Sequence, residues 1–372
     1  MKFLLLGNPE NRRVTLFQEA LALEGQPSAR VISWQDFLAD PNVLDALPDE
    51  PTRFRIDSAG ENDAVERAFL EHGYEPARRL GCRTISPRQL AKLAPSRGRI
   101  ICPRQGHLGF EAALARLDGI LERHPSWRCL APPRDIRELF DKRQTSARWS
   151  ALGIPVPEAL EGVTDTDSLF AKARERGWDE LFVKMSASSS ASCLAVVHLQ
   201  EAPSLHTTIE VARDGWFNTL KVRHVTAQPR VRELLDFLLA EGSQIERAIP
   251  KARLADAYFD LRVLCIANEP RFVVVRQNSH PITNLHLGGW RGDLAVLRQH
   301  VSPPAWEAAM QTCRRVARCY DALQVGLDLM FEPDFVGHRV IEANAFGDLL
   351  PRLELDGANV WQWQIREALA LR

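Results

Sequence analysis

Short apolar runs alternate with longer amphipathic segments over the first third of the chain. Runs typical of buried strands lie at residues 2–7, 29–34 and 98–103. Apolar residues recur at helical spacing in residues 14–25, 64–73 and 110–124. This alternation predicts a parallel sheet with helices on its faces, in an α/β domain that covers residues 1–130. The prolines of CLAPP, at 129–133, predict the end of that domain.

The pattern changes after residue 130, where strands follow one another more closely. One helix is predicted over 135–153, then an extended segment, and then a helix over 165–178. Strands are predicted at 180–185, 193–199, 243–249, 259–267 and 271–277, and as a pair within 324–345. Helices are predicted at 231–242 and 305–323. Residues 131–372 are therefore expected to form a two-part α+β domain, with a smaller part at about 155–245 and a C-terminal part at about 246–372.

Composition narrows the class of protein. The 372 residues are 45% hydrophobic, with 47 basic and 48 acidic residues, so nothing favours binding to nucleic acid or to an anionic membrane. No apolar run approaches the ~20 residues of a membrane helix. The start MKFLLLG is expected to be a first strand rather than a signal peptide. The 7 scattered cysteines indicate neither a disulfide framework nor a zinc site, and they favour the cytoplasm.

Two predicted strands carry acids that suit a metal. Glu342 and Asn344 are two residues apart, so they share one face of a strand, and Asp328 lies on the neighbouring strand. Carboxylate and amide oxygens are hard ligands that suit Mg²⁺ together with substrate phosphates. The alternative is that these are solvent-facing strand residues and a turn acid. Unpaired charge within apolar strands is costly, which favours the metal interpretation.

Several cations also lie at the ends of apolar strands. Lys184 precedes the small residues 186–192, so it either meets an anion such as phosphate or extends to solvent beside a serine loop. Arg276 ends a β-branched run, and its fork fits phosphate or an oxyanion. Asp260 and Arg262 share one strand face, where a cross-strand ion pair of little weight is the plain alternative. His286, in the loop TNLHLGGW, is expected to be an ordinary loop histidine.

The simple catalytic motifs are missing. The sequence has no GxxxxGK, HExxH or GxSxG pattern, and no GxGxxG follows the first strand. Arg104, Gln105 and His107 follow a predicted strand, where substrates bind in open α/β sheets, although a structural loop is the more economical interpretation.

Six stretches in this order resemble the ATP-grasp superfamily, and most closely its glutathione synthetase and RimK-like carboxylate–amine ligases. The matching stretches are DKRQTSARWSALGIPVPE, FVKMSASSSAS, IERAI, FDLRVLCIA, VVVRQNSHPITNLHLGG and VGLDLMFEPDFVGHRVIEANA. They extend from about residue 135 to the C-terminus. The resemblance implies ATP bound between two α+β units, and a ligase that forms an acyl-phosphate and joins it to an amine.

The resemblance also implies roles for single residues. Lys142 and Lys184 would contact the ATP phosphates, with residues 186–192 as a lid over them. The segment Glu246, Arg247, Ala248 and Ile249 would meet the adenine through its backbone, and Asp260 and Asn284 would be further nucleotide contacts. Arg276 would steady the transferred phosphate, and Asp328, Glu342 and Asn344 would bind Mg²⁺. We expect a small-molecule or peptide substrate, and a homodimer is compatible with the sequence.

The chain departs from the usual pattern of the family that it resembles at three places. No glycine lies in the lid loop, Ile282 replaces an arginine common in RimK-like enzymes, and NAFGDLLP replaces a proline–glycine turn. Asp348 in that last segment is expected to cap the final helix, with contact to a substrate amine as the alternative. A kinase of the same superfamily and a nucleotide-binding protein without ligase activity remain alternative functions.

Overall fold

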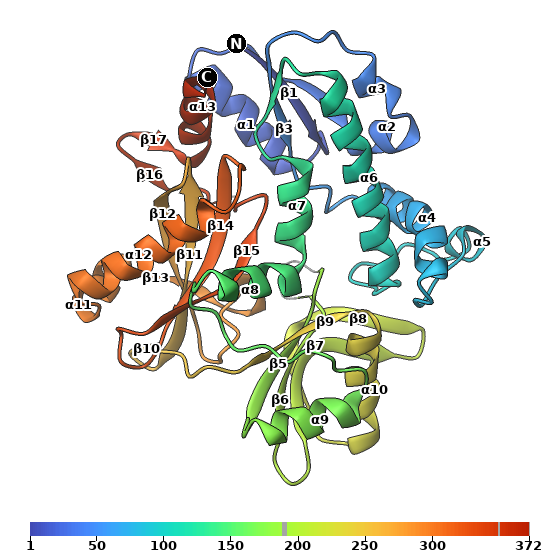
Figure 1. Cartoon of the computed structure of the whole chain (residues 1–372), viewed down its shortest axis with the longest axis vertical. Helices are drawn as coiled ribbons and strands as arrows, with labels where there is room; N and C mark the ends of the chain where they lie inside the picture. Colours follow the sequence, from blue (N-terminus) through green and yellow to red (C-terminus); the bar gives the residue numbers. More distant parts are fainter. Residues whose placement is uncertain (188–191, 349, 372) are drawn as a thin grey trace.

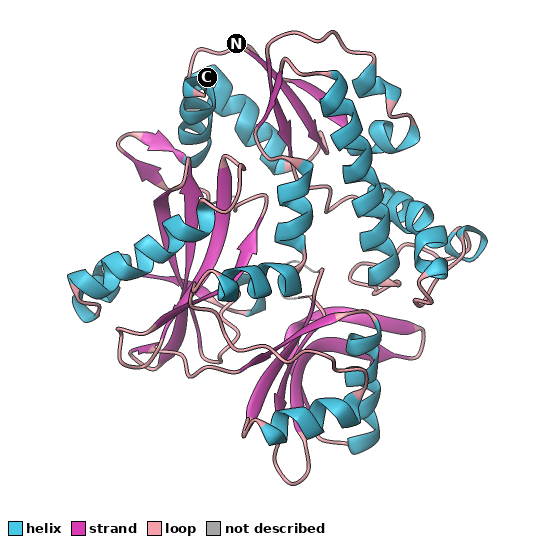
Figure 2. Ribbon diagram, in the orientation of Figure 1, coloured by secondary structure: helices cyan, strands magenta, loops and turns pink. Residues whose placement is uncertain are grey.

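The described residues form three larger sheets with helices packed on them and one two-stranded sheet (Figure 1). The computed structural model describes residues 1–187, 192–348 and 350–371. Strands and helices alternate in the first part of the chain, whereas in the later part several strands follow one another without a helix between them (Figure 2). The predicted parallel sheet is present in the first part of the chain, and antiparallel sheets follow it. The predicted domain bounds stay predictions.

The first sheet is parallel and has the strand order β2-β1-β3-β4. Its strands are β1 (Lys2–Gly7), β2 (Arg30–Ser33), β3 (Thr52–Ile56) and β4 (Trp127–Cys129). Phe3 and Leu5 of β1 pack with helices α1 (Arg12–Leu23) and α13 (Val360–Ala370). Leu4 and Leu6 point to the opposite side, against α2 (Trp34–Ala39), α4 (Asp63–Arg79) and α6 (Pro103–Arg123). Burial on both faces explains why β1 is a continuous apolar run.

The second sheet, which we call the lid sheet, is antiparallel with the order β8-β7-β6-β5-β9. Its strands are β5 (Glu180–Met185), β6 (Leu194–His198), β7 (Ser204–Ala212), β8 (Gly215–Val225) and β9 (Ser243–Arg247). Leu181, Val183 and Met185 pack against α9 (Thr166–Glu175) and α10 (Gln228–Ala240). Because side chains alternate along a strand, Phe182 and Lys184 lie on the other face. The sequence predicted the β5–β6 hairpin but assigned no element to β7 or β8.

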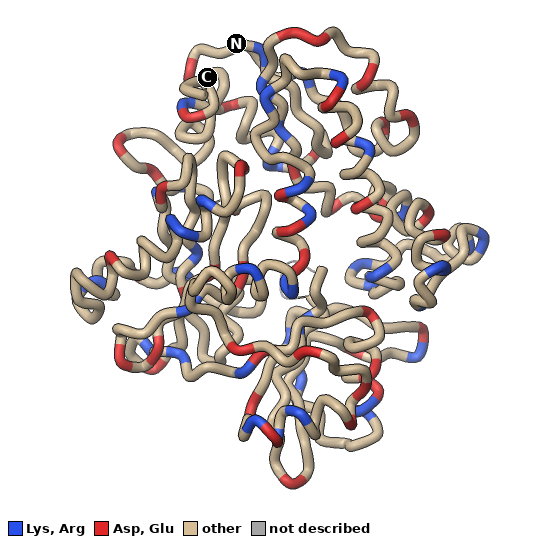
Figure 3. The backbone as a smooth tube through the Cα atoms, in the orientation of Figure 1, with Lys and Arg blue, Asp and Glu red and all other residues tan. Residues whose placement is uncertain are grey.

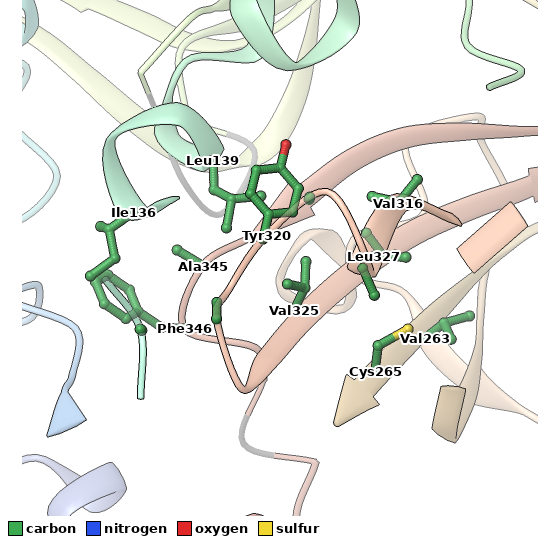
Figure 4. Close-up of a cluster of buried hydrophobic side chains, with 14 of the residues drawn as sticks. Ile136, Leu139, Val263, Cys265, Val316, Tyr320, Val325, Leu327, Ala345 and Phe346 are labelled. Atoms are coloured by element: carbon green, nitrogen blue, oxygen red, sulfur yellow. The ribbon is translucent and has the colours of Figure 1, made fainter. Parts of the chain in front are cut away.

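The third sheet, the C-terminal sheet, has the order β13-β12-β11-β14-β15, with β10 beside β11. Its strands are β10 (Arg253–Leu254), β11 (Ala257–Ile266), β12 (Glu269–Asn278), β13 (Trp290–Gly292), β14 (Gln324–Phe331) and β15 (His338–Asn344). Figure 4 shows Val263 and Leu327 of this sheet facing Val316 and Tyr320, with Leu139 nearby. Helix α12 (Pro303–Ala317) and the following residues therefore seal one face, and the predicted pairing of β11 with β12 is confirmed.

The remaining elements are short. They are α3 (Asn42–Asp45), α5 (Pro87–Leu90), α7 (Pro133–Phe140), α8 (Lys142–Ala151), η1 (Leu285–Leu287), α11 (Leu294–His300), β16 (Glu354–Leu355) and β17 (Ala358–Asn359). The single helix predicted over 135–153 is wrong, because it is divided at Asp141 into α7 and α8. Asp141 has φ −102° and ψ 97°, and its side chain accepts the backbone N–H groups of Arg143 and Gln144. A capping side chain at this point starts a new helix.

The strand predicted at 98–103 is also wrong, because Gly98 lies in a turn at φ 77°, Cys102 is left-handed at φ 41°, and Pro103 begins α6. Gly98 and Ile100 instead bond to the backbone of β8: Ile100 N donates to Trp216 O at 2.8 Å, and Asn218 N donates to Gly98 O at 2.7 Å. Arg99 makes an isolated bridge to Phe217. This segment therefore ties the N-terminal domain to the edge of the lid sheet.

Candidate active site

The polar side chains predicted from the sequence gather where the lid sheet faces the C-terminal sheet. Lys184 lies on the face of β5 that is turned away from α9 and α10, and its ammonium contacts the carboxylate of Glu246 on β9. The Glu246 side chain is only 6% exposed, so its charge needs this partner. Lys184 also lies 5.0 Å from the ring centroid of Phe182. Its ammonium is held inside the cleft by an anion, which disfavours the solvent-extended alternative.

Lys142 approaches the same place from helix α8, of which it is the first residue. Its Nζ lies 3.3 Å from Oε1 of Glu342 on β15. A pocket beside this pair is lined by α7, α8, β9 and β15, and it includes Gln244 and Glu246. The same pocket has apolar walls made by Leu139, Val156 and Val340, among others. Two lysines from different elements therefore border one cleft.

Arg276 on β12 joins two carboxylates of the C-terminal sheet. Its Nε donates to Asp260 Oδ1 at 2.7 Å, and its NH2 lies 2.9 Å from Asp328 Oδ2. Strand register places Arg276 directly opposite Asp260. Asp260, Arg276 and Asp328 therefore form one buried row across β12, β11 and β14.

Arg262 contacts two carboxylates of the site, which the sequence did not predict. Asp260 and Arg262 both make the cross-strand ion pairs of the alternative interpretation, Asp260 with Arg276 and Arg262 with Asp328, whose Oδ1 lies 3.1 Å from Arg262 NH1. In addition, Arg262 Nε lies 3.5 Å from Asp348 Oδ2. The prediction that Asp348 caps the final helix is wrong, because Asn359 caps α13. Register decides the pair of Arg262 with Asp328, since the two residues lie opposite each other in the antiparallel pair of β11 and β14.

Lys251 and Thr283 were missed by sequence reasoning. Lys251 Nζ lies 3.6 Å from Asp260 Oδ2 and donates to Thr283 Oγ1 at 3.2 Å, while the Thr283 hydroxyl donates to Asp260. A lysine just after the strand of residues 243–247 was a usable signal, but its neighbours come from distant parts of the sequence.

The charged side chains of the site form one group of five cations and five carboxylates, which we call the cleft cluster. They are Lys142, Lys184, Lys251, Arg262, Arg276, Glu246, Asp260, Asp328, Glu342 and Asp348.

Burial and neighbouring charges shift the pKa values of this cluster in opposite directions. Burial alone would raise the pKa of Asp260, but Arg276 and Lys251 outweigh it and lower that pKa to about 2. Burial raises the pKa of Asp328 despite its two arginines. Burial also lowers the pKa of Lys251, with Asp260 opposing that shift. Asp260 is thus a fixed structural anion, whereas the two arginines of Asp328 do not fully offset the effect of burial on its pKa.

Several polar atoms of the site have no hydrogen-bond partner among the described residues. They are Asp328 Oδ1, Arg262 Nε and NH1, Asn344 Nδ2 and Gln244 Nε2. Arg262 still makes ion pairs, but its N–H groups are poorly aligned for hydrogen bonds. Buried polar atoms without partners are rare in native proteins. Their concentration here indicates a site that a polar ligand completes.

Structural comparison identifies the fold. Over the full chain, the structure is similar to the ATP-grasp ligase PsnB complexed with a minimal precursor, at a TM-score of 0.55 and 14% identity, with 99% of that chain covered. It is similar to the D-cycloserine synthetase DcsG at a TM-score of 0.54 and 15% identity, covering 100% of this chain and 99% of that one. It is similar to the macrocyclase MdnC from Microcystis aeruginosa MRC, bound with the precursor peptide MdnA, at 0.54 and 12%, with 100% of both chains covered. No family model matches the chain, and no curated protein matches it in sequence.

This chain has the ATP-grasp fold. The resemblance inferred from six short stretches is thereby confirmed at the level of the fold, including the first 130 residues that the stretches did not cover. Within the part of the chain that the structure describes, no helix is long and apolar enough to cross a membrane.

The predicted magnesium ligands suit the ion in their donor chemistry. Asp328 and Glu342 are paired directly across β14 and β15, and Asn344 follows on the same strand. Among the described residues, no group of three His, Cys, Asp or Glu side chains is arranged to hold a metal. Magnesium typically takes one or two protein carboxylates and completes its shell with phosphates and waters. Asn344 Nδ2 has no hydrogen-bond partner among the described residues, which is compatible with an amide group whose Oδ1 binds a ligand.

The segment predicted to meet the adenine is partly occupied by the protein itself. Arg247 N donates to Glu158 O at 2.8 Å, and Ala248 N donates to Glu180 O at 3.1 Å. The Arg247 side chain is exposed. Carbonyl groups of this segment and the backbone of Ile249 are therefore the atoms left for a base. The prediction that this segment binds adenine stays a prediction.

The loop after β12 divides into residues that face the cleft and residues that shape the turn. Asn284 Oδ1 accepts the backbone N–H of His286 at 2.8 Å, so its side chain caps η1 and is not in contact with the cleft cluster. Ile282 is buried with Leu194 and Val196 of the lid sheet. An arginine at this position would bury a charge against an apolar patch, which accounts for its absence.

The candidate substrate residues of the N-terminal domain are not in a loop, because they occupy the first turns of α6. Gln105 is fully buried, and its amide donates to Ile85 O at 2.9 Å and accepts from Ile85 N at 2.8 Å. His107 lies 3.3 Å from Glu111 one turn later. The backbone N–H of Arg104 donates to Glu241 at 2.9 Å. Gln105 therefore has a structural role, and a substrate role for Arg104 and His107 stays a prediction.

The lid was predicted over residues 186–192, and residues 188–191 of it lie outside the described residues.

Proposed function

We propose that the chain is an ATP-dependent carboxylate–amine ligase. The observation that carries the proposal is the cleft cluster, which lies between two sheets of an ATP-grasp fold. Its cations and carboxylates are equal in number, and several of its polar atoms have no hydrogen-bond partner among the described residues. A nucleotide with magnesium adds charges of both signs. Such a ligand can therefore replace protein–protein ion pairs with protein–ligand ones at little cost in net charge.

Asp328, Glu342 and Asn344 would hold Mg²⁺, which when bound neutralises charge on the transferring phosphoryl group. Lys142 now contacts Glu342, and Lys184 contacts Glu246. In the nucleotide complex both ammonium groups would turn to the phosphates. The two protein carboxylates would then be free for the metal and for the nucleoside.

Arg276 and Arg262 act as fixed positive charges on the C-terminal sheet. Arg276 is held by Asp260 and Asp328, which raise its pKa although burial opposes them, so it stays protonated. The orphaned N–H groups of Arg262 can donate to the oxygens of the transferred phosphate. Preorganised donors of this kind stabilise charge that develops during transfer.

The proposed reaction has two displacements. An oxygen of the substrate carboxylate attacks the γ-phosphorus, the bond to the β–γ bridging oxygen breaks, and ADP leaves. The amine nitrogen then attacks the acyl carbon, phosphate leaves with the C–O bond electrons, and the nitrogen loses a proton. No protein nucleophile is needed, which agrees with the absence of the usual nucleophile motifs from the sequence.

The similar structures suggest which class of carboxylate is activated. PsnB and MdnC are described with precursor peptides, and DcsG is described as a D-cycloserine synthetase. We therefore propose a peptide carboxylate or an amino-acid-like small molecule as the activated group.

A coupled assay of ADP release tests this function. Carboxylates from a panel of amino acids and acidic peptides are offered with Mg²⁺ and ATP, each with and without an amine pool, and hydroxylamine is added to trap acyl-phosphate as a hydroxamate. A ligase gives ADP and hydroxamate with a carboxylate, and an amide when the amine is present. A stable phosphorylated product that ignores the amine would identify a kinase instead. Absence of ADP with every pair, together with ATP binding, would favour the non-catalytic alternative.

A further inference from the structure

A carboxylate outside the cleft cluster lies next to both predicted phosphate lysines. Asp141 immediately precedes Lys142, and its Oδ1 accepts the hydroxyl of Ser186 at 2.6 Å. Ser186 follows Lys184 by two residues, at the point where β5 ends. One side chain therefore connects the N-terminus of α8 with the end of the strand that carries the second lysine.

The same junction is closed by backbone hydrogen bonds. Lys142 N donates to Ser186 O at 3.2 Å, and Ser186 N donates to Gly242 O at 2.9 Å, so Ser186 lies between α8 and the segment that leads into β9. Ser186 is 2% exposed and Asp141 is 8% exposed. Such a buried junction restricts how Lys142 can move relative to Lys184.

The oxygens of Asp141 are already taken by donors. Beyond Ser186 they accept Arg143 N at 3.0 Å, Gln144 N at 3.3 Å and Gln144 Nε2 at 3.1 Å. Burial raises the pKa of Asp141, but the Ser186 hydroxyl and Arg143 outweigh it and keep the carboxyl ionised. An anion beside a phosphate site is unfavourable unless protein donors neutralise it. Asp141 is therefore placed to hold the site together rather than to bind substrate.

We propose that Asp141 is a positioning residue for the nucleotide phosphates, which through Ser186 sets the place of Lys142 against that of Lys184. This inference rests on the proposed function, because it assumes that the two lysines bind phosphate. A plain helix cap is the competing role, since an aspartate at this position caps α8 in any case.

Four substitutions separate positioning from capping. Ser186→Ala removes the hydroxyl bond and leaves the cap of α8 intact. Asp141→Ser keeps a residue that caps helices well, but its side chain is too short to reach Ser186. Asp141→Ala loses both functions. Asp141→Asn keeps an oxygen that can accept Ser186 and the helix N–H groups, but it loses the oxygen that accepts Gln144 Nε2. Asp293→Ala is the matched control, because Asp293 caps α11 by accepting Ala295 N at 2.7 Å and Val296 N at 3.4 Å, away from the cleft cluster.

The measurement is calorimetric affinity for a non-hydrolysable ATP analogue with Mg²⁺, alongside the melting temperature. We expect Ser186→Ala and Asp141→Ser to lose about tenfold in affinity, about 1.4 kcal/mol, with little change in melting temperature. Asp141→Ala should lose at least as much, Asp141→Asn should lie closer to the wild type, and Asp293→Ala should keep its affinity. Unchanged affinity in both Ser186→Ala and Asp141→Ser would reduce Asp141 to a cap and overturn the proposal.

A second readout keeps this test separate from the proposed function. Hydrogen exchange at the Lys142 amide, which donates to Ser186 O, reports the junction without nucleotide. We expect faster exchange there in Ser186→Ala than in Asp293→Ala. If the wild type bound no ATP analogue, the proposed function would fail. Faster exchange would then still demonstrate the link, and unchanged exchange would remove it.

Discussion

Two groups of buried charge in this molecule differ in how well their arginines are hydrogen-bonded. In the N-terminal domain, Arg55 of β3 donates to Asp57 at 3.2 Å and to Gln364 of α13 at 2.7 Å. Its guanidinium lies 4.8 Å from the ring centroid of Phe17 and 5.1 Å from that of Trp361. We call this the N-terminal cluster. The Arg55 guanidinium thus has aligned hydrogen bonds and two aromatic neighbours, while Arg13 lies 3.9 Å from Asp57 and Gln364 Nε2 has no hydrogen-bond partner among the described residues.

The cleft cluster contains more charge but fewer aligned contacts. Arg262 NH1 lies 3.1 Å from Asp328, yet neither this nitrogen nor the facing oxygen makes a hydrogen bond to another described residue. Figure 3 shows acidic and basic positions interspersed along the whole chain, so charge by itself does not mark the site. The comparison indicates that the quality of the contacts distinguishes a structural charge cluster from one that awaits a ligand.

The largest expected effect is loss of reaction from the cleft cluster. Glu342→Ala and Asn344→Ala should each lower ADP formation by at least a factor of about 10³, about 4 kcal/mol of barrier, because each removes a proposed metal ligand. Both side chains face the cleft, so the far-ultraviolet circular dichroism and the cooperative unfolding should be retained.

Glu354→Ala, in the exposed β16–β17 hairpin, is the control for these variants. Near-normal magnesium-dependent turnover in either cleft variant would show that the metal site is wrongly assigned.

The second expected effect is loss of stability from the N-terminal cluster. Arg55→Met should lower the free energy of unfolding by about 3–5 kcal/mol, because it removes the nearer cation of the buried Asp57 carboxylate and leaves only Arg13, whose NH1 lies 3.9 Å from Asp57 Oδ1. Urea denaturation measures this, and ADP formation per folded molecule should stay unchanged.

The double variant Arg55→Met with Asp57→Leu should recover part of the lost stability, since it removes a buried carboxylate that only the more distant Arg13 would otherwise neutralise. A fall in activity without a fall in stability would contradict the structural role of this cluster.

Removing one cation of the cleft should weaken nucleotide binding. Lys184→Met keeps most of the side-chain volume, and it should cost about 1.5–3 kcal/mol in affinity for a non-hydrolysable ATP analogue, the range for hydrogen bonds to charged groups. Calorimetry gives the value, with Lys172→Met on the surface of α9 as a control. Equal affinity of Lys184→Met and the wild type would leave Lys184 as a partner of Glu246 alone.

The smallest expected effect concerns the choice of base. If carbonyl groups near Glu246–Ile249 accept from the exocyclic amine of adenine, ATP should bind at least about tenfold more tightly than GTP, about 1.4 kcal/mol. Thermal-shift titration with both nucleotides measures the difference, because a ligand of the native state raises the melting temperature with concentration. Equal shifts would place the base elsewhere in the cleft.

Local pattern predicted much of the fold. The strands β1, β5, β11, β12 and β14 are apolar runs, and their bounds follow from side-chain alternation or from burial on both faces. The β5–β6 and β11–β12 hairpins were predicted because each pair is separated by a short polar segment. By contrast, β8 contains exposed positions and charged residues, so its sequence carries little strand signal. In β7, the alternation of Leu205, Thr207 and Ile209 was a usable signal that the sequence analysis missed.

The partners within the site could not be predicted, because strand register and long-range packing choose them. The sequence by itself determined that Lys184, Arg276 and Asp328 are charges at apolar strands that require compensation. Only the tertiary structure decided that Arg262 faces Asp328 rather than Asp260, since a shift of one residue between β11 and β14 would turn the side chains to opposite faces. Lys142 and Glu342 meet because α8 packs beside β15, and no local pattern encodes a contact between residues so distant along the chain.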